Sequence, residues 1–208
     1  MTAGSALGSR ARRIVGVVAT LVVTALAVGA AQGWGHTDQT AVAPPPPPAS
    51  SAPVVINSTD EAFIQLLIPM DEGALTLFDY LDTRPAVLDP SLRAVVDPIR
   101  TAHQTEVREM RAVLAAANVP EQNIHEGHQM PGMVTEVGLA ELRAAPGVEA
   151  RARAVTLIRA HLEQILVLCR GEQDAGASPE LKAIAARMQQ ARTVELRALA
   201  DQLGDRHD

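Results

Sequence analysis

Aromatic and thiol side chains are scarce in this sequence. Aromatic residues make up 2% of its 208 residues, and only Phe63, Phe78 and Tyr80 follow the proline-rich stretch. A folded core must therefore be built mainly from Leu, Ile, Val, Ala and Met. Cys169 is the single cysteine, which excludes a disulfide within the chain, and we expect its side chain to be a small buried apolar group.

Signatures of catalysis are also missing. The sequence contains no glycine-rich phosphate loop and no serine or cysteine in a recognisable nucleophile motif. The Glu-x-x-His motif of di-iron bundles is absent, because His103 precedes Glu106 and no other helix repeats the pair. We therefore predict that the chain is not an enzyme.

Positive charge is low outside the first residues. Residues 1–31 hold three Arg and no acid, so the remainder has 15 basic and 24 acidic residues and a net charge of −9. Nucleic-acid binding requires a basic face on the protein, so this excess of acidic residues excludes a nucleic-acid partner. An acidic surface is compatible with cation binding, although most acidic surfaces serve only solubility.

Residues 1–31 are typical of an export signal. Arg10, Arg12 and Arg13 precede an apolar run over residues 14–31, in the order basic then hydrophobic. The run is barely long enough to span a bilayer, for which about 20 residues are needed. A cleaved signal peptide and a retained membrane anchor both remain open. Either places the rest of the chain outside the cytoplasm, with the membrane contacted only through this segment.

Residues 32–58 predict a disordered, proline-rich linker. Five consecutive prolines, 44–48, lie among Ala, Ser and Thr residues. Such a segment is extended, stiff and unable to form a core. It would hold the following domain away from a membrane, or remain as a tail after cleavage of the leader.

Helical periodicity dominates residues 59–205. A capping-box sequence at 58–61 opens the first helix, and a cap followed by proline opens two others, at Asp89-Pro90 and Ser178-Pro179. Apolar residues recur at helical spacing after each start. The expected helices span residues 58–81, 90–118, 134–144, 148–171 and 179–203, with a kink or irregular turn at Pro98.

The helical part contains an internal repeat. Residues 89–110 align without gaps on 178–199, and residues 67–77 align less closely on 157–167. Two amphipathic hairpins bury their apolar faces best against each other, which predicts an all-α four-helix bundle. Its expected parts are hairpin one (59–118), the connector (119–147) and hairpin two (148–205).

Three short motifs follow one another in hairpin one and the connector. Residues 68–74 read Ile-Pro-Met-Asp-Glu-Gly-Ala, residues 104–110 read Gln-Thr-Glu-Val-Arg-Glu-Met, and residues 130–133 read Met-Pro-Gly-Met. Together they resemble domain of unknown function 305, a family of exported bacterial proteins with copper-binding members. The resemblance covers about residues 59–203 and implies a ferritin-like bundle that binds copper.

The resemblance also shows which ligands have changed. First helices in the family carry a His-His pair, whereas this chain has Met70-Asp71 in hairpin one and Ala160-His161 in hairpin two. At these positions Met70 offers a thioether to Cu(I), Asp71 a harder oxygen ligand and His161 an imidazole. The alternative for His161 is a partly buried, hydrogen-bonded residue.

The connector is the densest group of candidate metal ligands. His125, His128, Met130 and Met133 lie within nine residues, and imidazole and thioether groups suit Cu(II) and Cu(I). The alternative is a polar linker whose Pro131-Gly132 turn directs the following helix.

A second candidate group lies on one helix face. His103, Glu106 and Met110 are spaced i, i+3 and i+7, so their side chains share that face. They could hold a metal with Glu106 as the carboxylate ligand. The alternative is a solvated His103–Glu106 pair next to a methionine that fills the core.

Two functions remain open from the sequence. The first is an exported copper-binding bundle that takes part in extracytoplasmic copper handling, with the metal ion as its partner. The second is a bundle of the same descent that has lost metal binding and serves as a structural or protein-interaction module.

Overall fold

The computed structural model describes residues 54–123, 127 and 130–204. The predicted leader, residues 1–31, and most of the predicted linker, residues 32–58, lie outside the described residues. No helix among the described residues is long and apolar enough to cross a membrane.

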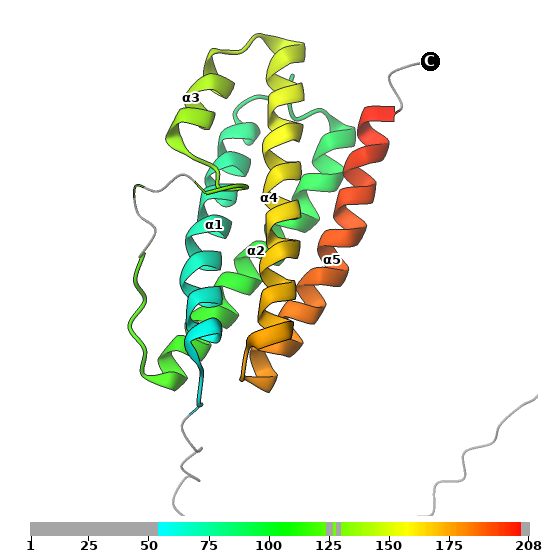
Figure 1. Cartoon of the computed structure of the whole chain (residues 1–208). Helices are drawn as coiled ribbons and strands as arrows, with labels where there is room; N and C mark the ends of the chain where they lie inside the picture. Colours follow the sequence, from blue (N-terminus) through cyan, green and yellow to red (C-terminus); the bar gives the residue numbers. More distant parts are fainter. Residues whose placement is uncertain (1–53, 124–126, 128–129, 205–208) are drawn as a thin grey trace, which may run out of the picture. The chain divides into compact units, whose positions relative to one another are not determined.

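The described residues form five α-helices and no β-strand. They are α1 (Ser58–Asp82), α2 (Pro90–Ala117), α3 (Glu136–Ala144), α4 (Gly147–Ala175) and α5 (Pro179–Gly204). The four long helices form a bundle, and the short helix α3 lies beside the first half of α4 (Figure 1). This arrangement confirms the predicted all-α four-helix bundle.

The order of the helices in the bundle requires one long connection. α1 packs against α2 and α4, α5 packs against the same two helices, and α1 and α5 lie diagonally opposite (Figure 1). Because α2 and α4 run in the same direction, residues 118–146 must return from one end of the bundle to the other. Its described parts, residues 118–123 and 130–146, lie beside α1 (Figure 1), and a single long crossover of this kind is found in ferritin-like bundles.

The helices begin close to the predicted positions, with one correction at α1. Its cap is Asn57, not Ser58: the Asn57 side chain accepts hydrogen bonds from the backbone N–H groups of Thr59 and Asp60. The Asp60 carboxylate in turn accepts from the backbone N–H of Asn57 at 2.6 Å. The capping box therefore lies one residue earlier than predicted: Asn and Ser are similarly good caps, and Asn57 and Asp60 also form hydrogen bonds to residues 175–178.

Other helix ends differ from prediction by a few residues. α3 begins at Glu136, two residues later than expected, because Thr135 supplies its cap. α4 continues through Gly171 to Ala175, four residues beyond the predicted end. A glycine inside a helix costs only about 1 kcal/mol, and Glu172, the residue that follows it, is buried against Asp60.

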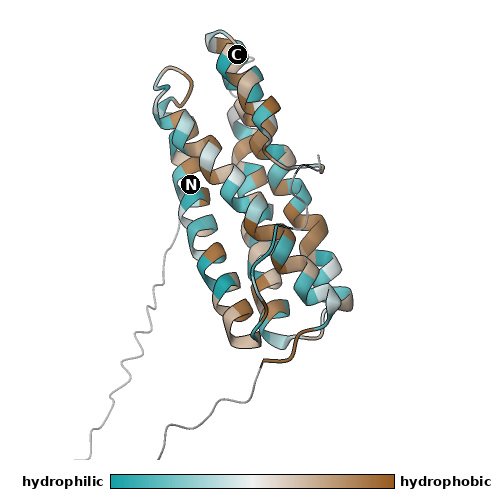
Figure 2. Cartoon of the chain, turned by 90° about the vertical axis from the view of Figure 1, so that its left-hand side faces the viewer, coloured by the Kyte–Doolittle hydropathy of each residue, from teal (hydrophilic) through white to brown (hydrophobic). Residues whose placement is uncertain are grey.

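Two apolar clusters fill the bundle, one toward each end. Hydrophobic and hydrophilic residues alternate along every helix, as amphipathic helices require (Figure 2). The first cluster lies at the end where α1 begins and includes Ile64, Leu67, Met110, Ile165 and Leu181. The second cluster lies at the other end and includes Leu77, Phe78, Leu92, Ile158 and Leu199.

A pair of carboxyl groups joins the start of α1 to the turn between α4 and α5. Asp60 is buried and accepts hydrogen bonds from the backbone N–H groups of Ala177 and Ser178, both at 3.0 Å. Burial and the hydrogen bond to Asp60 raise the pKa of Glu172 to about 8. Backbone donors outweigh burial at Asp60 and lower the pKa of that group. At neutral pH Glu172 is therefore protonated and donates to the Asp60 carboxylate.

This pair should make the protein less stable as the pH rises from about 5 to about 8. The pKa of Glu172 in the folded chain, about 8, lies above its ordinary value of 4.5. The stabilisation is thus complete below pH 4.5 and lost as the pH passes through 8. The free energy of unfolding should fall by up to about 1.4 kcal/mol per pH unit, measured by urea unfolding across this range.

A Glu172→Gln variant should remove this pH dependence, because an amide has no proton to lose. We expect it to be up to about 4 kcal/mol more stable than the unmodified chain at pH 8. Glu163→Gln, at an exposed position of the same helix, is the matched control and should keep the slope. Equal slopes for Glu172→Gln and the unmodified chain would show that another group titrates.

Candidate metal centre

A layer of buried polar side chains separates the two apolar clusters. Each long helix contributes to it at the point where its apolar residues pass from one cluster to the other. Side chains of this kind are seldom buried without partners, so their contacts need an explanation. This polar layer consists of Asp71 from α1, His103 and Glu106 from α2, His161 from α4, and Arg192 and the partly buried Glu195 from α5.

Three donor atoms from three helices converge in this layer. Nε2 of His103 lies 2.8 Å from Nε2 of His161. Oδ1 of Asp71 lies 3.8 Å from the first nitrogen and 3.6 Å from the second. A triangle with these sides has a circumscribed circle of radius about 2.0 Å, which is the usual length of a bond from Zn²⁺ to a histidine nitrogen or a carboxylate oxygen. One point is therefore at bonding distance from all three atoms.

The Asp71 carboxylate has no hydrogen-bond donor among the residues that the structure describes. The residue is fully buried, and neither of its side-chain oxygens accepts a hydrogen bond from these residues. An unpaired buried carboxylate is costly, and the cost disappears only if a proton or a cation comes to it. The groups that face the Asp71 carboxylate are the two histidine nitrogens. A proton or cation that neutralises Asp71 would therefore lie between these three side chains.

Neighbouring groups orient both imidazole rings. Nδ1 of His161 lies 3.3 Å from the backbone oxygen of Gly132 in the connector. Nδ1 of His103 accepts a hydrogen bond of 2.8 Å from Arg192 and lies 3.4 Å from a carboxylate oxygen of Glu106. Because a guanidinium only donates, the neutral His103 ring carries its proton on Nε2, facing His161. Both Nε2 atoms thus point to the centre of the layer. In metal sites, hydrogen-bond partners of the other ring nitrogen orient the ligating histidines in the same way.

Arg192 is the fixed positive charge of the layer. It is fully buried, donates to Glu106 at 2.9 Å and forms an ion pair of 2.8 Å with Glu195. The layer contains three carboxyl groups and one guanidinium. Burial lowers the pKa of His103 well below its ordinary value, which favours the neutral ring. Burial also raises the pKa of Glu106 and of Glu195. With the carboxyl groups ionised and the histidines neutral, a divalent cation would balance the layer.

The internal repeat relates the members of the layer in pairs. Residue numbers in hairpin two exceed those in hairpin one by 89 or 90, as in the sequence alignment. The equivalent positions are Asp71 and His161, His103 and Arg192, and Glu106 and Glu195. The third pair has glutamate in both hairpins, whereas each of the other two pairs combines a histidine with a charged residue.

Comparison with known families identifies the chain. The model of the family described as domain of unknown function (DUF305) matches residues 60–203. The chain belongs to the DUF305 family. This membership was the one that the three sequence motifs predicted.

Two solved structures share the fold of this DUF305 domain. A DUF305 fragment from Deinococcus radiodurans superposes with a TM-score of 0.63 at 21% identity, covering 72% of this chain and 97% of that one. A DUF305 protein from Streptomyces coelicolor, described as a candidate secreted protein, gives a TM-score of 0.64 at 21% identity, covering 72% and 94%. No curated protein matches the chain significantly.

The structure separates the predicted ligands of the DUF305 domain into different places. Asp71, His103 and His161 come together, and among the described residues they alone form a group of three or more His, Cys, Asp or Glu donors within 4.8 Å of one another. Glu106 lies next to His103 in the layer, so the alternative of a solvated His103–Glu106 pair is wrong. Met110 packs in the first apolar cluster and fills the core.

The described part of the connector packs its backbone against α4. Gly132 has a φ of 73°, and a Cβ there would collide with Gln164 and the backbone oxygen of Ala160 on α4. The turn at Met130–Met133 thus places its backbone against α4, where the Gly132 oxygen faces His161. His125 and His128 lie outside the described residues.

Met70 and Cys169 are buried side chains outside the polar layer. Met70 is fully buried and precedes Asp71 on α1. Cys169 is buried and free, as predicted, and burial raises the pKa of its thiol to about 12. A thiol with this pKa is neutral at physiological pH, so it behaves as an apolar group and not as a nucleophile.

Sequence reasoning missed Arg192 and the Gly132 carbonyl oxygen. The repeat held a signal for the first, because the alignment pairs Arg192 with His103 and Glu195 with Glu106. A guanidinium among carboxylates and imidazoles would then have pointed to one polar cluster. No residue type signals the second, since any residue supplies a backbone oxygen.

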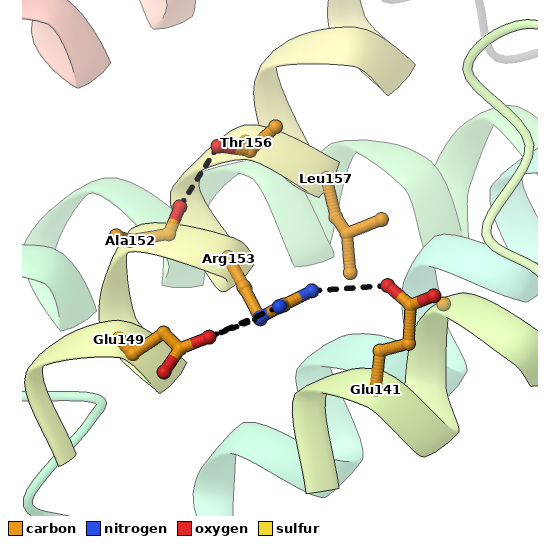
Figure 3. Close-up of a pocket in the computed structure, with 7 residues that line it drawn as sticks. Glu141, Glu149, Ala152, Arg153, Thr156 and Leu157 are labelled. Atoms are coloured by element: carbon orange, nitrogen blue, oxygen red, sulfur yellow. Dashed lines mark hydrogen bonds and ion pairs between the residues drawn. The ribbon is translucent and has the colours of Figure 1, made fainter. Parts of the chain in front are cut away.

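A surface pocket between α3 and α4 is unrelated to the polar layer. It has a volume of about 370 Å³, and Arg153 lies across it (Figure 3). The guanidinium pairs with Glu141 and Glu149, both at 3.0 Å, and all three side chains are exposed. Exposed ion pairs of this kind contribute about 0–1 kcal/mol, so the pocket carries no strained or unpaired group.

Proposed function

We propose that this DUF305 domain binds one divalent transition-metal ion, copper(II) in preference, through Asp71, His103 and His161. The observation that carries the proposal is the fully buried Asp71 carboxylate, which accepts no hydrogen bond from the described residues. One point lies about 2.0 Å from its Oδ1 atom and from both Nε2 atoms. Outer partners that orient both rings support the same conclusion.

The donor set favours a divalent ion over Cu(I). Two imidazole nitrogens and a carboxylate oxygen suit Cu(II), Zn(II), Ni(II) and Fe(II), and affinities of such sites generally peak at Cu(II). The excess of carboxylates over guanidinium in the layer also favours a charge of two. The predicted leader would place this activity outside the cytoplasm, which is consistent with a role in extracytoplasmic copper handling.

Metal binding requires a change at His103 that the layer can accommodate. The Nε2 atom must give up its proton to bind the ion, and the ring then carries its proton on Nδ1. At that position the Arg192 donor no longer fits, whereas a Glu106 oxygen at 3.4 Å can accept the hydrogen bond. The layer thus provides a hydrogen-bond partner for each of the two forms of the ring.

Titration of the purified chain with Cu(II) and Zn(II) tests the proposal. We expect one ion per chain, and we expect His161→Gln to weaken binding by about 100-fold or more, because a ligand matters at least as much as its outer partners. Replacement of His125, His128, Met130 and Met133 by alanine is the matched control and should leave the affinity within a few-fold.

The opposite pattern would move the site. If the connector replacement abolished binding while His161→Gln retained it, the connector would be the metal site. If the unmodified chain bound neither ion more tightly than a micromolar chelator, the polar layer would have a purely structural role in a protein-interaction bundle.

A further inference from the structure

A surface groove between α2 and α5 leads to the polar layer. It has a volume of about 520 Å³ and is lined on the α2 side by Thr101, Thr105 and Glu106, and on the α5 side by Arg187 and Ala191. Of the four lateral contacts in the bundle, the one between α2 and α5 is the least extensive. The groove therefore lies along the seam where the helices are most easily reached from solvent.

Glu106 connects the groove with the metal ligands. It lines the groove, and 7% of the residue is exposed to solvent. Its carboxylate also belongs to the polar layer. One oxygen accepts from Arg192 at 2.9 Å. The other accepts no hydrogen bond from the residues that the structure describes and lies 3.4 Å from Nδ1 of His103. An oxygen ligand for a cation is thus available between solvent and the first histidine.

Where the structure describes them, the other sides of the layer are more tightly packed. The two apolar clusters cover it from both ends of the bundle. On the side of α1 and α4 the connector lies against both helices, with no room for a side chain at Gly132 and little at Gly73. The pockets between α3 and α4, between α1 and the connector, and between α4 and α5 are lined by no residue of the layer.

An ion pair spans the outer part of the groove. Arg187 on α5 and Glu109 on α2 both line it, and their side chains meet at 2.8 Å. Both are partly exposed, so they can separate at small cost. Arg187 opposes an approaching cation and Glu109 attracts it.

We propose that the α2–α5 groove is the route by which divalent cations enter the polar layer, with Glu106 as the internal contact and the Glu109–Arg187 pair at the entrance. The inference rests on the metal site of the proposed function. It adds a path and a kinetic role for residues that are not ligands.

Labelling the groove tests this route directly. Thr105→Cys on α2 and Thr156→Cys on α4 are matched variants, since both threonines are exposed, line a pocket and bond to the carbonyl four residues earlier. Each is labelled with fluorescein maleimide; Cys169 is buried, and the raised pKa of its thiol protects it from the reagent. Stopped-flow mixing with a weak chromophoric chelate of Cu(II) or Zn(II) then gives the rate of uptake.

We expect the label at position 105 to slow uptake by about 10-fold or more and to leave the equilibrium affinity within about 3-fold, whereas the label at position 156 changes neither. In unlabelled chains, Arg187→Gln should speed uptake and Glu109→Gln should slow it, each by a few-fold at low salt, because the charge at the entrance changes in opposite directions. The two shifts should shrink as the salt concentration rises.

The outcomes separate the route from the site. Equal uptake rates for the two labelled chains, with binding intact, would overturn the route and leave the metal site standing. Failure of the unlabelled chain to bind either ion at equilibrium would overturn both.

Discussion

Replacement of Arg192 by methionine should lower the free energy of unfolding of the metal-free chain by about 3–5 kcal/mol. Methionine fills a similar volume, so the loss comes from charge and not from a cavity. Without the guanidinium, Glu106 and Glu195 remain in the core with no partner of opposite charge. Urea unfolding at neutral pH, monitored by helical circular dichroism, measures the difference.

Two controls separate charge pairing from general damage to the core. Arg187→Met on the same helix removes an exposed ion pair and should cost less than about 1 kcal/mol. The triple variant Arg192→Met, Glu106→Gln, Glu195→Gln should recover most of the stability, because it removes the unpaired charges together. A small loss for Arg192→Met alone would mean that the carboxyl groups remain neutral or hydrated in the layer.

The fold could be predicted because its signals are local or repeated. Two helical hairpins are indicated by the helical periodicity, by the 89-residue repeat and by the proline that follows a cap at Asp89-Pro90 and Ser178-Pro179. Two hairpins of amphipathic helices pack into a bundle. Helix ends were less certain, because they depend on tertiary contacts. The four extra residues of α4 include Glu172, whose burial against Asp60 at the α4–α5 turn has no signature in the sequence around it.

The candidate centre could be predicted only in part. Asp71, His103 and His161 were each identified as candidate ligands, but their convergence depends on how three helices are aligned along the bundle. His103 and His161 are separated by 58 residues, and no spacing rule joins them. The candidate ligands of the connector are neighbours in sequence, so composition alone reveals them. The members of the polar layer share only their positions on buried helix faces, where a polar residue needs a partner.

Replacement of Asp71 by asparagine should have opposite effects on metal binding and on stability. The amide has nearly the shape of the carboxylate but no negative charge, so affinity for Cu(II) or Zn(II) should fall by about 100-fold or more. In the metal-free chain the same change replaces a buried carboxylate that accepts no hydrogen bond from the described residues, and it introduces an N–H donor near two histidine nitrogens. The free energy of unfolding should therefore rise by about 1 kcal/mol or more.

The sign of the stability change distinguishes a ligand from a structural residue. If Asp71 held the fold together through a charged histidine, Asp71→Asn would destabilise the metal-free chain, because the carboxylate would lose an ion pair. A carboxylate kept for a cation instead destabilises the empty layer and stabilises the loaded one. Asp97→Asn, the same replacement at an exposed position on α2, is the matched control and should change neither quantity. Equilibrium metal titration and urea unfolding of these two variants, with and without Cu(II), therefore decide whether the polar layer is a metal site.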